Sequence, residues 1–153
     1  MIDFALTADA VAPQLLGCTL THAGVSIRLT EVEAYLGAED SAAHTFNGKT
    51  PRNAAMFGPP GRFYVYISYG IHRNVNIVCA PDGTGQGCLL RGGEIIEGAD
   101  IAFARRGTSD FHNLARGPGN LGKALGFTLE DNHQPIQLVE RTTEPEWVCG
   151  PRI

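Results

Sequence analysis

The sequence lacks any apolar run long enough to cross a membrane, and its N-terminus lacks the basic and apolar stretches of an export signal. Its cysteines form no C-x-x-C pair, and no histidine stands at metal-ligand spacing from them. These absences predict a cytoplasmic protein with no membrane partner, no bound metal and reduced, buried cysteines. The cysteines are Cys18, Cys79, Cys88 and Cys149.

Acidic charge is missing from one long segment. No Asp or Glu occurs from Ser41 to Pro81, although the whole chain has a formal net charge of -4. The segment carries unopposed basic residues, which are Lys49, Arg52, Arg62 and Arg73. An acidic chain argues against a nucleic-acid partner, because nucleic-acid-binding domains are usually basic. The local distribution of charge nevertheless leaves that partner open.

The composition is that of an ordinary folded domain. Hydrophobic residues make up 43% and charged residues 18% of the 153 residues, which excludes disorder and suits one domain over 1–153. Strand patterns cluster with only short helices between them, so we predict a mostly antiparallel α+β fold. The expected strands are 18–21, 25–35, 63–68, 74–79, 87–91, 136–139 and 147–149. Helices are expected after Thr7 and over 97–106 and 118–125.

The acid-free segment contains the run Phe63-Tyr64-Val65-Tyr66-Ile67-Ser68-Tyr69-Gly70. Side chains alternate across a strand, so its first, third and fifth residues form an apolar face and Tyr64, Tyr66 and Ser68 form the other. Flat rings beside cations are typical of a surface that binds unstacked nucleobases. Tyrosine is also a common half-buried strand residue, which is the better interpretation of any one of them.

A second candidate lies on the strand that contains Glu31, Glu33 and Tyr35. Strand alternation places these three side chains on one face, and the chain then enters a polar loop that ends at His44. A random pair of such carboxylates would be a solvated strand face. A carboxylate, a tyrosine and a histidine within so short a stretch favour a site for general-base catalysis.

Four motifs in this order resemble the alkyladenine (3-methyladenine) DNA glycosylase family, the purine-excising type without a helix-hairpin-helix motif. They are E-A-Y-L-G-x-E-D-x-A-A-H at 33–44, T-P-R-N-x-x-M-F at 50–57, Y-V-Y-x-x-Y-G at 64–70 and L-L-R at 89–91. The similarity extends from about Leu15 to the segment 117–121, and weakly to the end. It implies a curved sheet with short peripheral helices and a protruding β-hairpin.

The resemblance also implies the roles of individual residues. Glu33 matches the general base that activates a water for attack on C1′ of the deoxyribose, and Arg91 matches an arginine that helps to hold that water. Residues that match the sandwich around the flipped base are Tyr35, His44 and Tyr66. Asn76 matches the position that disfavours normal guanine by crowding its 2-amino group.

The family's DNA contacts are carried over in the same way. Tyr69 matches the residue that enters the minor groove and fills the gap in the base stack. We therefore expect its side chain to be exposed at a hairpin tip. Phosphate contacts are expected from Lys49, Arg52 and Arg73. By analogy, the backbone N–H near Ala42 is the expected hydrogen-bond donor to neutral lesions such as hypoxanthine.

The implied protein is a monomeric, monofunctional base-excision repair enzyme that acts on double-stranded DNA containing damaged purines. It needs no metal and no cofactor, and it is associated with the nucleoid if the source is bacterial. A lyase step would need a lysine at C1′, and neither Lys49 nor Lys123 falls at a catalytic position of the family. Family members usually continue past a segment like 150–153, so the chain is expected to lack its last C-terminal strand.

Two other functions stay open at this point. A non-catalytic module could bind single-stranded nucleic acid by stacking bases on Tyr64 and Tyr66. It would bind undamaged single strands equally well and release no base. A small-molecule nucleoside hydrolase would act on free nucleosides, and it would not depend on Tyr69.

Overall fold

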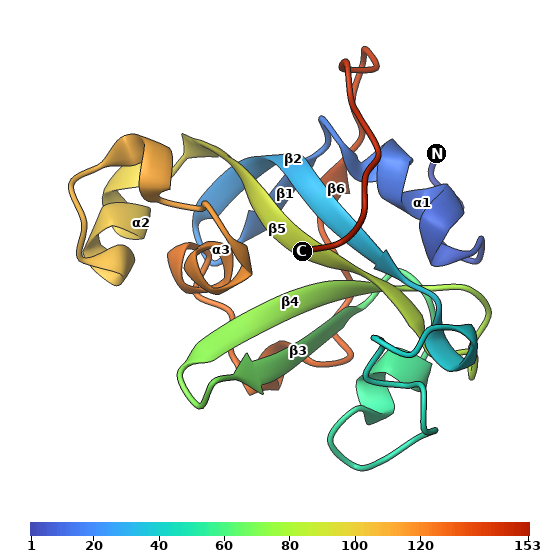
Figure 1. The fold of residues 1–153 in the computed structure, drawn as a ribbon. Helices are drawn as coiled ribbons and strands as arrows, with labels where there is room; N and C mark the ends of the chain where they lie inside the picture. The colour runs from blue at the N-terminus through green and yellow to red at the C-terminus, as the bar shows by residue number, and fades with distance from the viewer.

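The computed structural model describes residues 1–153. Its centre is a six-stranded antiparallel sheet with the strand order β3-β4-β5-β2-β1-β6, which confirms the predicted α+β fold (Figure 1). The strands are β1 (Thr19–His22), β2 (Val25–Tyr35), β3 (Phe63–Ser68), β4 (His72–Cys79), β5 (Gln86–Glu97) and β6 (Leu138–Val139).

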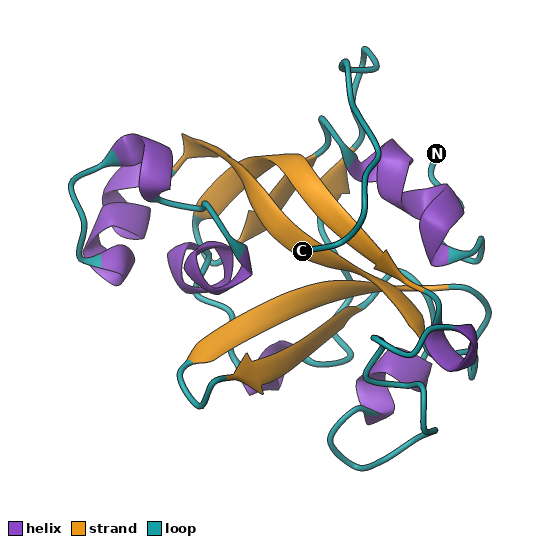
Figure 2. Cartoon of the chain, viewed as in Figure 1, coloured by secondary structure: helices purple, strands orange, loops and turns teal.

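Three short α-helices lie around the sheet (Figure 2). They are α1 (Ala8–Leu15), α2 (Ala99–Arg106) and α3 (Pro118–Ala124). Helix α1 packs on β2 and β5, α3 packs on β4 and β5, and α2 packs on α3. Thr7 is the residue before α1, as expected, but its side chain makes no capping hydrogen bond. No helix is both long enough and apolar enough to span a membrane.

The predicted alternation of β3 divides its side chains between two apolar clusters. Phe63 and Val65 belong to the main core, together with residues of every other strand except β6. Tyr64 belongs to a separate small cluster with Met56 and Val78, and only 1% of its surface is exposed. Both faces of β3 are therefore covered at this end, and the strand becomes accessible only toward Ser68.

Two successive bulges between β2 and β5 determine which side chains face the same way. Glu31 pairs with Gly92 and Val32 pairs with Leu90, so Arg91 has no partner residue opposite it. A bulge re-aims the side chain of its extra residue. This irregularity brings the guanidinium of Arg91 to the face of β2 that carries Glu31 and Glu33.

The C-terminal end differs from the prediction. Residues 147–149 form no strand, and the segment 140–153 contains no regular secondary structure. It runs back so that its end lies over β2 (Figure 1). Cys149 is exposed there, so the expectation of four buried cysteines is wrong for this one and confirmed for the other three. Residues 147–149 form no strand because the tail crosses the sheet and has no neighbouring strand with which to pair.

Candidate active site

The centre of the site is Glu33, whose side chain is only 7% exposed on β2. Its Oε2 accepts a hydrogen bond from the Tyr35 hydroxyl at 3.0 Å, and its Oε1 lies 2.8 Å from Nη1 of Arg91. Nε of Arg91 donates to Oε1 of Glu31 at 3.0 Å. One guanidinium thus bridges Glu31 and Glu33, which lie on one face of the strand as their spacing predicted.

The Oε1 atom of Glu33 is the most informative atom of the site. It is buried and accepts no well-aligned hydrogen bond, even though Arg91 is close enough to form an ion pair. Buried carboxylate oxygens normally have aligned donors, and exceptions concentrate at functional sites. Oε1 is thus held by the charge of Arg91 and not by a well-aligned donor.

The charge of Arg91 is secured by its neighbours. Burial alone would lower its pKa, but the hydrogen bond to Glu31 and the negative charges of Glu33 and Glu31 outweigh burial, so the pKa of Arg91 is raised. Tyr35 is held protonated because burial and then the charge of Glu33 raise its pKa to about 12. The Tyr35 hydroxyl therefore stays a donor to Glu33 near neutral pH.

Beside this centre lies a small pocket that opens to solvent. Its walls are mostly aromatic: the lining residues are Tyr35, Ala42, His44, Met56, Tyr64, Tyr66 and Asn76. The rings of His44 and Tyr66 are 4.2 Å apart at an angle of 64°. The structure thus brings together all five residues that the resemblance assigned to base binding.

Tyr35 separates this pocket from an open groove. The groove runs between β2 and the C-terminal segment, and Glu33, Asp40 and Arg152 line it. Tyr35 lines the pocket but not the groove, whereas Glu33 lines the groove but not the pocket. Tyr35 therefore links the two, because its ring lines the pocket and its hydroxyl donates to Glu33 in the groove.

Tyr64 has a role that sequence reasoning did not find. Its hydroxyl lies 3.2 Å from Nδ1 of His44, and burial raises the pKa of Tyr64 to about 12. Burial, and then the charge of Arg52, lower the pKa of His44, which keeps the imidazole neutral at pH 7. We therefore assign the Tyr64 O–H as donor to Nδ1 and place the imidazole proton on Nε2.

Two asparagines of β4 hold the tyrosines of β3 that line the pocket. Asn76 is 3% exposed, and its Nδ2 donates to the carbonyl of Tyr64 at 3.3 Å. Asn74 was not predicted to take part, and its Nδ2 donates to the Tyr66 hydroxyl at 3.2 Å. Strand alternation could have indicated it, because Asn74 and Asn76 share one face of the strand. Together they hold Tyr64 and Tyr66 against the pocket.

The loop that carries His44 is held by Asn53, the last residue of the T-P-R-N motif. Nδ2 of Asn53 donates to the carbonyls of His44 and Gly48, each at 3.1 Å, and its Oδ1 accepts from the N–H of Thr50 at 2.7 Å. Asn53 is 4% exposed. The motif therefore supplies a structural anchor for the pocket wall.

Replacement of this anchor should destabilise the fold. In Asn53→Ala, two partly buried carbonyls and an N–H lose their partners, so the free energy of unfolding should fall by ~1–3 kcal/mol. Urea denaturation followed by circular dichroism measures the change. Asn47→Ala, at an exposed residue of the same loop, is the matched control and should change stability by less than about 0.5 kcal/mol. Equal effects of the two substitutions would contradict this role of Asn53.

Ala42 lines the pocket, but its N–H donates to Oδ1 of Asp40 at 3.1 Å. A bound base could use this N–H only by sharing or replacing that hydrogen bond. Asp40 also accepts from the N–H of Leu36 at 3.0 Å and from the guanidinium of Arg152. The hydrogen bonds from Arg152, opposed by burial and aided by the two N–H groups, lower the pKa of Asp40 to about 2.

The low pKa of Asp40 predicts a specific dependence of stability on pH. The folded-state pKa lies below the ordinary value of 3.8, so the ionised carboxylate stabilises the fold above about pH 4, and this contribution is lost as the pH falls toward 2. The shift corresponds to about 2 kcal/mol. The difference in unfolding free energy between wild type and Asp40→Asn should shrink between about pH 5 and pH 2. A constant difference in urea titrations across that range would contradict the assignment.

The hairpin of β3 and β4 ends in the most exposed aromatic side chain of the chain. Tyr69 is 94% exposed, and it has a φ of 52° next to Gly70 with a φ of 75°. Two positive φ values make the tight turn that lifts the ring away from the sheet. The expectation of an exposed tip is confirmed, and Ile71 beside it is 73% exposed.

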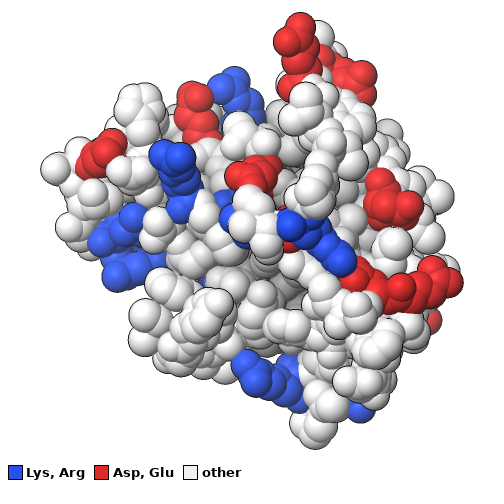
Figure 3. All heavy atoms as spheres, in the orientation of Figure 1, with Lys and Arg blue, Asp and Glu red and all other residues white.

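Basic residues flank the hairpin. Nη2 of Arg52 donates to the carbonyl of Ile67 at 2.9 Å, and Arg73 is the residue paired with Ile67 across the strands. Lys49 is exposed in the loop before Arg52 and forms no ion pair. The lower part of the face in Figure 3, where β3 and the preceding loop lie, shows basic side chains and no acidic ones. The segment from Ser41 to Pro81, which has no acidic residue, thus contributes to a surface region without acidic side chains on this face.

Comparison with known proteins decides the family. A family described as "Methylpurine-DNA glycosylase (MPG)" matches residues 2–153. The chain belongs to the methylpurine-DNA glycosylase family. It is thus a DNA glycosylase, an enzyme of base excision repair, and the resemblance seen in its motifs is confirmed.

Individual relatives of this glycosylase come from bacteria. A protein of Corynebacterium efficiens named "Putative 3-methyladenine DNA glycosylase" is 68% identical over 99% of this chain and 83% of its own length. A relative with the same name from Corynebacterium glutamicum strain ATCC 13032 is 63% identical over 99% of this chain and 84% of its own length. A third, from Rhodopseudomonas palustris, is 47% identical over 98% of this chain and 75% of its own length.

Proposed function

We propose that this glycosylase excises alkylated or deaminated purines, of the 3-methyladenine and hypoxanthine class, from double-stranded DNA. The observation that carries the proposal is the buried Glu33 carboxylate, which is paired with Arg91 and hydrogen-bonded to Tyr35, a residue that lines the aromatic pocket. In this proposal a flipped base would enter the pocket, and its sugar would lie near the carboxylate of Glu33.

The reaction requires the damaged nucleotide to leave the duplex. Base flipping costs a few kcal/mol, and stacking against aromatic rings offsets it by ~1–3 kcal/mol per base. Tyr35, His44 and Tyr66 would supply this stacking within the pocket. Tyr69 would enter the duplex and occupy the space that the base has left, which hinders its return.

Hydrolysis then breaks the bond between C1′ and the purine nitrogen, whose electron pair leaves with the base. A water oxygen bonds to C1′, and Glu33 takes the water proton through Oε1. Positive charge develops on the sugar, and the carboxylate stabilises it. Arg91 holds Glu31 and Glu33 in place and helps to orient the water. The reaction uses neither metal nor cofactor.

Substrate selection follows from the same residues. Alkylated purines carry a positive charge, which electron-rich tyrosine faces attract. Asn76 lines the pocket, and in this proposal it crowds the 2-amino group of guanine and so disfavours the normal base. No lysine lines the pocket or the groove, so we propose a monofunctional enzyme that leaves the abasic strand intact.

The proposed alternatives fit less well. A single-strand binding module needs the faces of Tyr64 and Tyr66, and Tyr64 is 1% exposed. A nucleoside hydrolase gives no purpose to an exposed tyrosine at the tip of a hairpin flanked by Arg52 and Arg73. The protein is proposed to act as a monomer, because the pocket, Glu33 and the hairpin all lie on one chain.

The test compares three substrates with the same protein. Lesion-containing duplex should lose its base, whereas undamaged single strands and free inosine should not. Released base is measured by chromatography, and abasic sites are measured by alkaline strand cleavage. Hydrolysis of inosine would favour the nucleoside hydrolase, and tight binding of single strands without any release would favour the binding module.

A further inference from the structure

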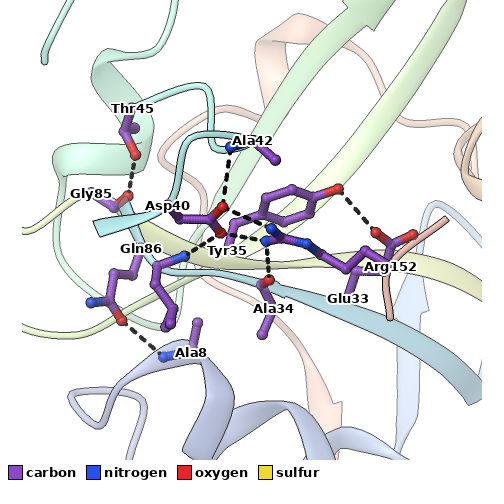
Figure 4. Close-up of polar contacts among 11 residues, drawn as sticks. Ala8, Glu33, Ala34, Tyr35, Asp40, Ala42, Thr45, Gly85, Gln86 and Arg152 are labelled. Carbon is purple, nitrogen blue, oxygen red and sulfur yellow. Dashed lines mark hydrogen bonds and ion pairs between the residues drawn. The ribbon is translucent and has the colours of Figure 1, made fainter. Parts of the chain in front are cut away.

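Arg152, in the segment that has no regular secondary structure, makes a dense set of contacts beside the site (Figure 4). Its guanidinium donates to Oδ1 of Asp40 at 2.8 Å, to Oδ2 of Asp40, and to the carbonyl of Ala34 at 2.9 Å. Its central carbon lies 4.6 Å from the centroid of the Tyr35 ring. A planar guanidinium can satisfy a carboxylate bidentately and cover a ring at the same time, which a lysine cannot do.

Asp40 transmits these contacts to the wall of the pocket. It is 8% exposed, and it accepts hydrogen bonds from the N–H groups of Leu36 and Ala42. The same carboxylate therefore holds the end of β2 and the loop that leads to His44. A buried carboxylate needs an opposite charge, and Arg152 is its only ion-pair partner.

The position of the Tyr35 ring completes the geometry. One side of it belongs to the pocket, and the groove beyond it is lined by Glu33 and Arg152. Its hydroxyl donates to Glu33, and Arg152 lies over its ring. If the ring tilts, the pocket wall and the hydrogen bond to Glu33 both change.

We propose that Arg152 is a positioning residue. It holds Tyr35 and the Asp40 loop so that the pocket can bind the base of a nucleotide while Glu33 acts at the sugar of the same nucleotide. The proposal rests on the proposed function, because it concerns the geometry of base excision. Arg152 touches neither DNA phosphate nor the reacting atoms in this role. Its removal should therefore slow excision without weakening the binding of DNA.

Arg141 provides a matched control in the same segment. It anchors the beginning of the tail through hydrogen bonds from Nη1 to the carbonyls of Pro13 and Leu16, each at 2.8 Å. Its other hydrogen bond and ion pair are to Glu144, and it forms none with Tyr35 or Asp40. If Arg152 only fastened the tail, Arg141→Ala and Arg152→Ala would have the same effect on excision.

The experiment measures single-turnover excision of hypoxanthine from duplex DNA at increasing enzyme concentrations. Arg152→Ala should lower the maximal rate by about 10- to 100-fold, as expected for a misplaced reacting group, with the half-saturating concentration unchanged. Arg152→Lys keeps the charge but loses the fork, so its rate should be intermediate. Arg141→Ala should keep the wild-type rate. Emission of Trp147, the single tryptophan, reports whether the tail stays in place in each folded variant.

The outcomes separate this inference from the function on which it rests. If wild type releases no base, the proposed function fails. If wild type is active and Arg152→Ala matches it, or if Arg141→Ala is slowed equally, the positioning role of Arg152 is overturned. Should Arg152→Ala fail to fold, Arg152→Lys carries the test, and a wild-type maximal rate in that variant overturns the proposal.

Discussion

Glu33→Gln should abolish base release while leaving the binding of lesion-containing DNA intact. Glutamine keeps the shape of the side chain but cannot accept a proton from water or stabilise positive charge at C1′. Loss of a general base lowers rates by ~10²–10⁴-fold, and loss of the stabilising charge adds to this, so we expect at least about a 10³-fold decrease. Single-turnover excision and equilibrium binding to the same duplex measure the two effects.

Glu31→Gln is the control for this prediction. Glu31 lies on the same face of β2 and is paired with the same Arg91, but its side chain is 51% exposed and does not face the pocket. Its replacement should change the excision rate by less than about fivefold, because it removes an exposed ion pair worth ~0–1 kcal/mol. Equal losses in both variants would show that the charge of the strand face, and not the position of Glu33, determines the rate.

Tyr69→Ala should slow excision from duplex DNA without affecting the stability of the protein. The ring is 94% exposed, so the folded protein loses no packing when it is removed. Insertion of an aromatic side chain into a stack is worth ~1–3 kcal/mol, which corresponds to about a 5- to 150-fold lower rate. Excision from a single-stranded lesion should change little, because there is no gap in a duplex to fill.

The ratio of duplex to single-strand rates is therefore the decisive readout for Tyr69. Val139→Ala, on β6 at the opposite edge of the sheet, removes another exposed apolar side chain and should leave that ratio unchanged. If Tyr69→Ala reduces both rates equally, the ring does not act as a wedge.

Local sequence patterns predicted the parts of the site that lie on single strands. Alternation along β2 placed Glu33 and Tyr35 on one face, and alternation along β3 separated Phe63 from Tyr66. The exposed position of Tyr69 followed from the glycine after it. These patterns succeed because the period of a strand fixes which side chains share a face, whatever the strand packs against.

The contacts that depend on the whole fold could not be predicted in this way. The side chain of Arg152 reaches Asp40 across more than a hundred residues of sequence, through a segment that was expected to include a strand. The bulge at Arg91 appears only when β5 pairs with β2. Tyr64 was left without a role, because its burial depends on Met56 and Val78. Pairing and packing between distant segments, not local propensity, decide such positions.

Base release from a duplex with one lesion at a defined position tests the central claim most directly. Mass spectrometry of the products should show one free purine per abasic strand with wild-type protein, an uncleaved sugar-phosphate backbone, and no free purine from the matched undamaged duplex. Absence of free purine from the lesion duplex, with protein that is folded and bound to it, would contradict the account.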